Sequence, residues 1–327
     1  MGELVNRRVV DWVQQRLRQV PEVSEWAEMG ALVDRLDRAR SMSCLEYPLM
    51  VARALGQDEE LALPAVASIF CSLTSINLVD DILDRDPRGD HVRWGEGVAA
   101  NLALAFQALA VGILEDTASE QPWRQSAAMS SVASMMAGTA LGQNLDLGEC
   151  STDEQYWMLV DAKTSPLFTC ALKMGALLAG GTVEDAQRIG GLGFYLGRIV
   201  QVNDDVGDSL EVPAKPDWRL GSANLPILYA SIADHAEKEH FVSLLGQVED
   251  PGVLAEAQRI LVESGAISFA FYQVVTTYRE ARRHLEKVAV PHPDHLQDLL
   301  DSHLQPLRSL LTSLNIEMPV EMTNDRR

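Results

Sequence analysis

Thr74–Asp86 reads TSINLVDDILDRD, an apolar run that ends in closely spaced carboxylates. On a helix, residues three or four positions apart share a face, so Asp80 and Asp84 lie one turn apart with Asp81 beside them. Like charges this close are unfavourable without a cation among them, and Mg²⁺ commonly bridges one or two carboxylates to the phosphates of a substrate. A solvated acidic turn is the alternative interpretation, and it is common in acidic chains.

The overall charge of the chain is strongly negative. Asp and Glu outnumber Lys and Arg by 47 to 27 in 327 residues, which gives a formal net charge of −20. This charge disfavours nucleic acid and anionic membranes as partners. It does not disfavour a phosphorylated small molecule, because bound metal ions can invert the sign of a local site.

Cysteine usage and hydropathy indicate the compartment. The cysteines stand singly, without a CxxC pair, at Cys44, Cys71, Cys150 and Cys170. That pattern favours reduced thiols over disulfides or zinc ligands. We find no signal-peptide pattern and no run of 18 or more uncharged apolar residues, so no membrane span is predicted. We therefore expect a soluble cytoplasmic protein.

Apolar residues recur at helical spacing along most of the chain, and no convincing strand pattern is present. The predicted helical segments are 4–20, 25–40, 45–55, 59–86, 97–114, 126–147, 153–178 and a long segment from 182 past 208. Length alone also allows two domains. We predict an all-α fold: one helical-bundle domain over residues 1–315 with a central active-site cavity, and a frayed tail over 316–327.

A second acidic motif, Gln201–Asp208, reads QVNDDVGD. Asp204 and Asp208 are one helical turn apart with Asp205 adjacent, and Gln201 lies one turn earlier. In helical bundles, metal sites form from side chains on facing helices. Two facing carboxylate clusters can hold several Mg²⁺ ions and a diphosphate between them. Because two chance matches are rarer than one, the pair favours a metal site over an acidic turn.

Together the motifs resemble the trans-isoprenyl diphosphate synthase (polyprenyl synthetase) family, which has the class I terpenoid synthase fold. The likeness runs from about Leu45 to Pro226 in the expected order. It comprises DDILD at Asp80–Asp84, GQNLD at Gly142–Asp146, KTSPLF at Lys163–Phe168, QVNDDVGD, and a degraded loop KPDWRLGSANLP at Lys215–Pro226.

The resemblance implies roles for particular residues. The Mg²⁺ cluster (three ions with the diphosphate bound) would be held by Asp80, Asp81, Asp84, Asp204, Asp205 and Asp208. The allylic diphosphate would contact Lys163, Lys215 and Arg88, with Gln143, Thr164 and Gln201 lining the site. Of these, Asp80, Asp81, Asp84, Lys163 and Asp204 would be catalytic. The resemblance also implies a homodimer.

The chemistry expected of such a site is heterolysis of a carbon–oxygen bond, which leaves a diphosphate and an allylic cation. Metal ions and a lysine stabilise the departing negative charge. A dry apolar cavity protects the cation from water, and aromatic faces stabilise it. Phe168, Phe194 and Tyr195 are candidates, although ordinary core packing is the alternative for each. Ser75 is small and precedes Asp80 by five residues, so the cavity could accept a C15 or longer chain; otherwise Ser75 simply packs against another helix.

The sequence departs from the family where the acceptor, isopentenyl diphosphate, would bind. The family has a basic GKR-x-RP stretch there, whereas Ser41–Gly56 reads SMSCLEYPLMVARALG, with Glu46 at its centre. After the first motif, Pro87-Arg88-Gly89 retains one arginine where the family has two. Each lost cation should weaken phosphate binding by about 1.5–3 kcal/mol.

These losses favour an enzyme that ionises an allylic diphosphate without using isopentenyl diphosphate. It would then be a terpene synthase, cyclising or eliminating, or a transferase to another prenyl acceptor. The first alternative is ordinary chain elongation, with Arg38, Arg40 or Arg53 replacing the missing cations. The second alternative is a non-catalytic partner subunit of a synthase, against which the two intact acidic motifs argue.

Overall fold

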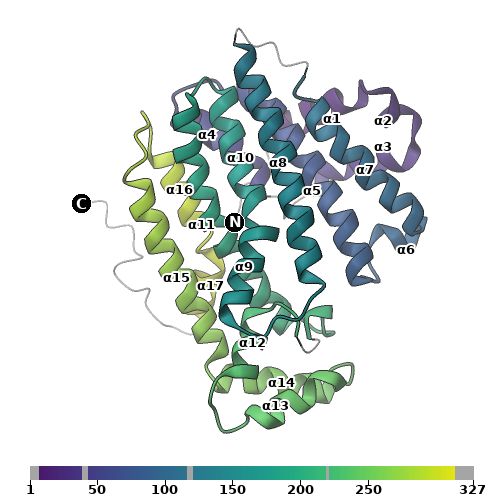
Figure 1. Cartoon of the computed structure of the whole chain (residues 1–327), viewed down its shortest axis with the longest axis vertical. Coiled ribbons are helices and arrows are strands. Elements are labelled where there is room, and N and C mark those ends of the chain that lie inside the picture. The colour runs from purple at the N-terminus through teal and green to yellow at the C-terminus, as the bar shows by residue number, and fades with distance from the viewer. Residues whose placement is uncertain (1–6, 39–42, 116–120, 219–220, 314–327) are drawn as a thin grey trace.

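The computed structural model describes residues 7–38, 43–115, 121–218 and 221–313, and the regular structure of these residues is entirely helical (Figure 1). The all-α prediction is confirmed. The α-helices are α1 (Arg7–Arg18), α2 (Pro21–Glu25), α3 (Ala27–Asp34), α4 (Tyr47–Ala54), α5 (Leu63–Asp84), α6 (Asp90–Trp94), α7 (Glu96–Gly112), α8 (Pro122–Asp146), α9 (Asp153–Lys163), α10 (Ser165–Leu178), α11 (Val183–Leu210), α12 (Leu225–Ile232), α13 (Lys238–Leu244), α14 (Pro251–Glu263), α15 (Ala266–Leu285), α16 (Asp294–Ser302) and α17 (Gln305–Ser313). Short 3₁₀ helices are η1 (Arg35–Arg38), η2 (Ser43–Glu46), η3 (Glu59–Ala62), η4 (Pro216–Trp218) and η5 (Leu245–Gln247).

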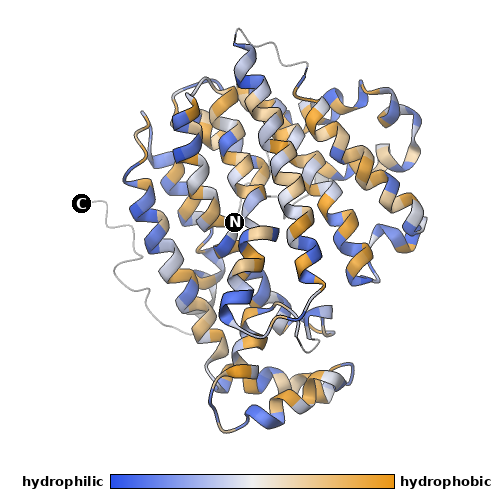
Figure 2. Cartoon of the chain, viewed as in Figure 1, coloured by the Kyte–Doolittle hydropathy of each residue, from blue (hydrophilic) through white to orange (hydrophobic). Residues whose placement is uncertain are grey.

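One hydrophobic cluster runs through the bundle, from Val9 in α1 to Leu307 in α17. Helix α5 lies inside it and contacts α7, α8 and α10. In Figure 2, apolar residues follow the helices of the bundle, and polar residues gather on the outer face of α15. The segment Glu59–Asp84 is long and apolar enough to cross a membrane, but 72% of its most apolar window is buried. It therefore serves as a core helix of this bundle.

Helices α10 and α11 approach each other closely because glycines face the contact. A Cβ atom on Gly193 would lie 2.4 Å from the backbone nitrogen of Thr169, and one on Gly197 would lie 2.5 Å from Cα of Ser165. Any side chain at these positions would force the helices apart. The close approach brings Thr164, just before α10, next to Gln201 of α11.

Helix boundaries follow local capping chemistry. The predicted segment 153–178 is two helices, because Pro166 disfavours a continuous helix through Thr164 and instead occupies the first turn of α10. The break leaves Lys163 as the last residue of α9. Helix α11 begins with a capping box in which Thr182 and Asp185 each accept a hydrogen bond from the other's backbone N–H.

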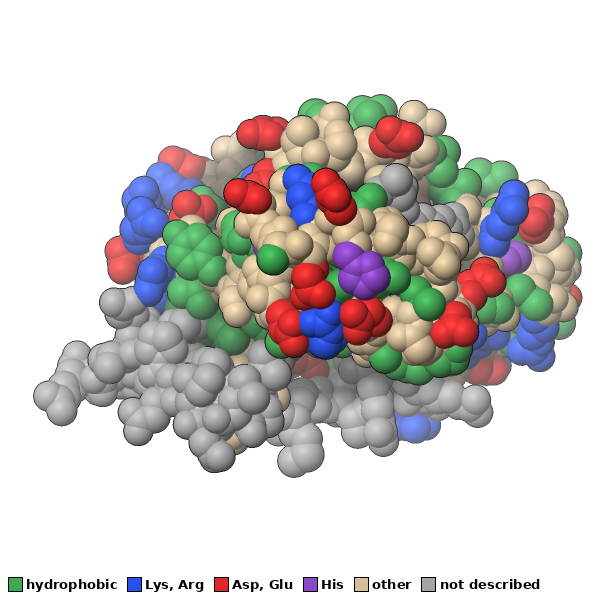
Figure 3. Space-filling view, turned by 90° about the horizontal axis from the view of Figure 1, so that it is seen from below, with side chains coloured by type: hydrophobic (Ala, Val, Ile, Leu, Met, Phe, Trp, Pro, Cys, Tyr) green, Lys and Arg blue, Asp and Glu red, His purple; other side chains and the backbone are tan. Residues whose placement is uncertain are grey.

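Three sequence expectations fall on residues that the structure does not describe. These are Arg40 as a replacement cation, the tail 316–327, and residues 219–220 within the degraded loop. Acidic side chains are spread over the face formed by the lower part of the molecule (Figure 3). Of the basic residues near that face, Arg259 already pairs with Glu237 and Glu256.

Candidate active site

Three helices end at one cavity of about 420 Å³, and each brings a carboxylate to it. Helix α5 ends at Asp84, α8 ends at Asp146, and α11 ends two residues after Asp208. The C-terminal end of a helix carries a partial negative charge, which adds to the charge of these carboxylates. The cavity is therefore strongly negative, and a cationic partner would be stabilised there.

Lys163 lies among these carboxylates. Its Nζ is 2.6 Å from Oδ2 of Asp146 and 3.1 Å from Oδ1 of Asp80. Burial alone would lower the pKa of Lys163, but Asp80 and Asp146 outweigh burial and raise that pKa above its ordinary value. Lys163 is thus held as a cation at the end of α9, where the helix dipole also favours positive charge.

Gly142 of α8 allows Lys163 to reach this position. A Cβ atom at Gly142 would lie 2.5 Å from the backbone nitrogen of Lys163 and 2.5 Å from the carbonyl carbon of Ala162. The neighbouring Gln143 donates a hydrogen bond from Nε2 to Oδ1 of Asp80. The buried Oε1 of Gln143 has no partner among the described residues, which leaves an acceptor for a ligand or solvent donor.

The aspartates of the first motif do not all line the cavity. Asp80 and Asp84 line the cavity, and burial together with Asp80 raises the pKa of Asp84 to about 6. Asp81 does not line it. A Cβ atom at Gly89 would lie 2.8 Å from Cβ of Asp81, so this aspartate packs against the loop that carries Arg88. Burial, then Asp86 and Asp80, raise the pKa of Asp81.

Asp205 of the second motif is buried and fully engaged by protein donors. Its Oδ2 accepts from the hydroxyl of Tyr156 at 2.6 Å and from the backbone N–H of Leu225 at 2.9 Å. Its Oδ1 accepts from Nε2 of Gln201 at 2.8 Å. Burial raises its pKa to about 7, although these hydrogen bonds oppose the rise. The carboxylate therefore ties α9, α11 and α12 together.

The other aspartates of the second motif are more open. Asp208 lines the cavity, and burial followed by Asp217 raises its pKa, while Lys215 opposes the rise. Asp204 is solvent-exposed and is not among the residues that line the cavity. Partial burial and the charge of Asp208 raise its pKa to about 6.

Gln201 connects the two helices beside the cavity. It lines the cavity, and its Oε1 accepts a hydrogen bond from Oγ1 of Thr164 at 2.5 Å. Because its Nε2 donates to Asp205, a continuous chain of hydrogen bonds runs from Thr164 to Tyr156. This chain fixes the end of α9 relative to α11.

Ser75 and Phe168 lie in the core, away from the cavity lining. Ser75 is buried and donates a hydrogen bond from Oγ to the carbonyl oxygen of Ala103 at 2.8 Å. The ring of Phe168 packs at 5.6 Å, centroid to centroid, against that of Tyr47. Phe194 is covered by the guanidinium of Arg198, 4.4 Å from the ring centroid. Packing therefore accounts for the contacts of these side chains.

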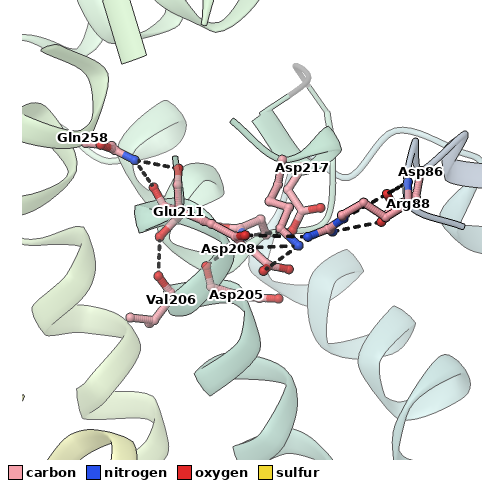
Figure 4. A network of polar contacts seen from close by, with 11 residues as sticks. Asp86, Arg88, Asp205, Val206, Asp208, Glu211, Asp217 and Gln258 are labelled. Carbon is pink, nitrogen blue, oxygen red and sulfur yellow. Dashed lines mark hydrogen bonds and ion pairs between the residues drawn. The ribbon is translucent and has the colours of Figure 1, made fainter. Parts of the chain in front are cut away.

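Arg88 and Lys215 join the two acidic motifs through carboxylates. Figure 4 shows Arg88 beside Asp86. Arg88 binds Asp86 with both Nε and Nη2, at 3.1 and 2.9 Å. Its Nη1 is 3.7 Å from Oε1 of Glu211. Lys215 Nζ is 3.2 Å from Oε2 of Glu211 and 3.6 Å from Oδ1 of Asp208. Both cations are thus paired with protein carboxylates.

The stretch where the family binds a second diphosphate is largely buried here, and its charged residues are Glu46 and Arg53. Cys44, Leu45 and Tyr47 are each at most 4% exposed. The Tyr47 hydroxyl is 2.5 Å from Nε2 of His303, and Nδ1 of His303 is 2.9 Å from the carbonyl oxygen of Leu299. Arg53 pairs with Glu59 through Nε and Nη2.

Several residues that shape the site were not singled out from the sequence. Asp217 and Glu149 line the cavity, Tyr156 holds Asp205, and Glu211 holds Arg88 and Lys215. Asp146 lies within GQNLD, so its position in that motif was a signal. Tyr156 is a buried aromatic with no spacing relationship to Asp205, 49 residues away, and the sequence held no signal for it.

The donor set fits magnesium held jointly with a phosphorylated ligand. Asp80, Asp84 and Asp208 present hard oxygen ligands to one cavity. Among the described residues, no three Asp, Glu, His or Cys side chains converge closely enough to hold a metal ion alone. Mg²⁺ usually takes one or two carboxylates plus substrate phosphates rather than an all-protein cage, so this arrangement is the appropriate one.

A profile of the polyprenyl synthetase family matches residues 38–261, which include both acidic motifs and Lys163. The chain belongs to this family. Among its relatives, a geranylfarnesyl diphosphate synthase from Aeropyrum pernix is 31% identical over 263 residues, covering 73% of this chain and 81% of the relative. A geranylgeranyl diphosphate synthase from Methanosarcina mazei is 29% identical over 250 residues, covering 73% and 76%.

Solved structures of the family share the fold. A polyprenyl synthase from Caulobacter crescentus, complexed with calcium and isoprenyl diphosphate, superposes with a TM-score of 0.77. It is 23% identical, and the match covers 91% of this chain and 93% of that chain. The predicted class I isoprenoid synthase bundle is therefore confirmed, and the polyprenyl synthetase resemblance with it.

Proposed function

We propose that this protein is a magnesium-dependent prenyltransferase that ionises an allylic prenyl diphosphate. The observation that carries the proposal is the position of Lys163, a half-buried cation between Asp80 and Asp146 at the cavity where α5, α8 and α11 end. A diphosphate in that cavity would meet one fixed positive charge and three carboxylate-bearing helices, of which α5 and α11 are suited to hold metal ions between them.

In the proposed mechanism, Asp80, Asp84 and Asp208 would hold the Mg²⁺ ions, with Asp204 at the exposed edge. When bound, these ions would neutralise the charge that develops on the leaving diphosphate. Lys163 is positioned to donate a hydrogen bond to the leaving group. Thr164 and Gln201 fix the end of α9 so that Lys163 stays in place. Leu83, Leu147 and Leu159 are apolar members of the cavity lining, and Leu83 and Leu147 are also exposed to solvent.

For the acceptor, the relatives favour isopentenyl diphosphate. The relatives described above are named as diphosphate synthases, which build longer prenyl chains. Their names support chain elongation here, and they do not support the terpene-synthase interpretation that the sequence alone favoured. We therefore place chain elongation first, with an allylic substrate of C15 or longer as the proposed size class.

A second candidate is transfer of the prenyl group to an uncharged acceptor, or rearrangement of the prenyl group with no acceptor at all. The observation that favours it is the burial of Cys44, Leu45 and Tyr47, with the Tyr47 hydroxyl bound to His303. A phosphate binds most strongly to Arg and Lys. Within residues 43–56 the basic side chain is that of Arg53, and it is paired with Glu59.

One incubation decides between these candidates. Purified protein and MgCl₂ are mixed with farnesyl or geranylgeranyl diphosphate, with and without isopentenyl diphosphate, and the products are separated by mass. Longer diphosphates that form only with isopentenyl diphosphate support elongation. Hydrocarbon or alcohol products without it support the second candidate. No turnover of any allylic diphosphate, with the fold intact, would favour the partner-subunit alternative.

We also propose a cytoplasmic homodimer. The supporting observation is that α7 and α8 contact each other and each carries an exposed leucine, Leu104 at 64% and Leu141 at 60%. Exposed large apolar side chains are candidates for contact with a second subunit. Light scattering after size exclusion should give twice the chain mass for the wild type and the monomer mass for the Leu104→Glu/Leu141→Glu double variant.

A further inference from the structure

Glu211 occupies an unusual position at the end of α11. It follows the last residue of the helix, where the backbone turns into an extended conformation. The side-chain amide of Gln258, on α14, donates to the carbonyl oxygens of Ser209 and Glu211 at 3.3 and 3.2 Å. The backbone of Glu211 is therefore anchored from α14, and its carboxylate projects toward the cations of the site (Figure 4).

The carboxylate of Glu211 bridges two cations that come from different parts of the chain. Oε1 is 3.7 Å from Nη1 of Arg88, and Oε2 is 3.2 Å from Nζ of Lys215. Each cation already has another carboxylate, because Asp86 binds Arg88 with two hydrogen bonds and Asp208 pairs with Lys215. Glu211 is thus an additional carboxylate for each of the two cations.

The charges around Glu211 disfavour the binding of an anion. The two cations face Asp86, Asp208 and Glu211, so the local sum is negative before Asp217 and the negative end of α11 are added. Glu211 and a phosphate group would compete for the same N–H donors. A phosphate that binds Arg88 or Lys215 either takes the donors that Glu211 uses or binds beside the Glu211 carboxylate, and both cases cost binding free energy.

We propose that Glu211 is an internal competitor of the diphosphate, a positioning residue that holds Arg88 and Lys215 away from phosphate and thereby weakens ligand binding. The inference rests on the proposed function, since Lys215 pairs with Asp208, which lines the cavity. Beyond that function, Glu211 would set the affinity for diphosphate through its contacts with Arg88 and Lys215, without binding the metal.

The test is isothermal titration of inorganic diphosphate in the presence of MgCl₂ into wild-type protein and the Glu211→Gln variant. The glutamine keeps the shape and removes the charge. Because each exposed ion pair contributes modestly, we expect Glu211→Gln to bind on the order of threefold to tenfold more tightly. The matched control is Glu184→Gln, which removes the same charge from an exposed Glu–Arg pair with Arg188 at the other end of α11 and should change the affinity less than twofold.

A Lys215→Ala background shows whether the gain in affinity depends on the cations that Glu211 contacts. In that background, Glu211→Gln should give a smaller gain than in the wild type. Equal or weaker binding by Glu211→Gln, while the wild type binds diphosphate, would overturn the competitor role and leave the proposed function standing. Absence of magnesium-dependent diphosphate binding by the wild type would instead overturn the proposed function and the competitor role together.

Discussion

The hydroxyl of Tyr156 lies 2.6 Å from Oδ2 of Asp205, and this hydrogen bond joins α9 to α11 beneath the cavity. Tyr156 is fully buried and Asp205 is 2% exposed. The same aspartate accepts hydrogen bonds from Gln201 and from the backbone of Leu225. The second aspartate of this acidic motif therefore supports the structure around the cavity instead of facing it.

Replacing Tyr156 by Phe should destabilise the protein by about 1–3 kcal/mol, because a buried carboxylate loses a donor that nothing nearby replaces. The pKa of Asp205 should rise further. Urea unfolding followed by circular dichroism measures the free energy. Tyr272→Phe is the matched control, since Tyr272 is 60% exposed, and it should stay within about 0.5 kcal/mol of the wild type. Equal stability of both variants would contradict the supporting role of Tyr156.

Asp80→Asn and Asp204→Asn should each lower turnover of an allylic diphosphate on the order of 100-fold or more, because each removes a proposed metal ligand. Circular dichroism spectra should match those of the wild type. Product formation is measured at saturating MgCl₂. Near-normal turnover of Asp80→Asn would refute the cavity as the site of ionisation, and near-normal turnover of Asp204→Asn would remove that residue from the site.

Gly142→Ala should lower both turnover and stability, because its Cβ atom would press on the backbone of Ala162 and Lys163 at about 2.5 Å. We expect a loss of about 1–3 kcal/mol and a more than tenfold fall in turnover as Lys163 is displaced. Gly138→Ala is the control on the same helix, one turn earlier. A Cβ atom there meets no atom within 4 Å, so the change should be neutral or stabilise the helix by about 0.5–1 kcal/mol. Identical behaviour of the two variants would show that the close approach does not position Lys163.

Stability measured in EDTA should fall as pH rises from about 4 to about 7. The pKa of Asp84 is raised to about 6, whereas an unfolded aspartate titrates near about 3.9. A carboxyl with a raised folded-state pKa favours the folded state when protonated, so its contribution is present below about pH 4 and is lost as pH rises through 6. Asp84→Asn should therefore be more stable than the wild type at pH 7.5, by about 1–3 kcal/mol, and equal to it at pH 4.

A second aspartate serves as the control for that pH dependence. Asp161 binds Arg198 with two hydrogen bonds of 2.6 and 2.7 Å, so Asp161→Asn should lose stability at pH 7.5. Both free energies come from urea titrations at the two pH values. If Asp84→Asn also lost stability at pH 7.5, ionised Asp84 would not destabilise the folded protein, and the expected pH dependence would be wrong.

The helical period predicted which residues of each motif share a face, but it could not show which face meets the cavity. Asp80 and Asp84 are on the cavity side, while Asp81 packs against the loop at Gly89. In the second motif Asp208 lines the cavity and Asp205 is enclosed by donors. Those outcomes depend on α6, α9 and α12, whose packing is set by contacts far apart in the sequence.

The roles of the basic residues were the hardest to predict. Lys163 was expected beside the diphosphate, and its pairing with Asp80 and Asp146 follows from a helix break that Pro166 marks in the sequence. Arg88 and Lys215 were also expected there, but their shared partner Glu211 belongs to no recognisable motif. Its importance depends on the path of the chain after α11, which local patterns do not specify.

The convergence of α5, α8 and α11 on one cavity has a practical consequence. Since three like-charged helix ends oppose each other there, a ligand that neutralises them and binds only the folded protein stabilises it by RT ln(1 + L/Kd), where L is the free ligand concentration. A melting curve of this protein can therefore rank metals, diphosphates and prenyl chain lengths without any chemical turnover. The substrate can be sought by heating the protein with candidates, before a single product has been identified.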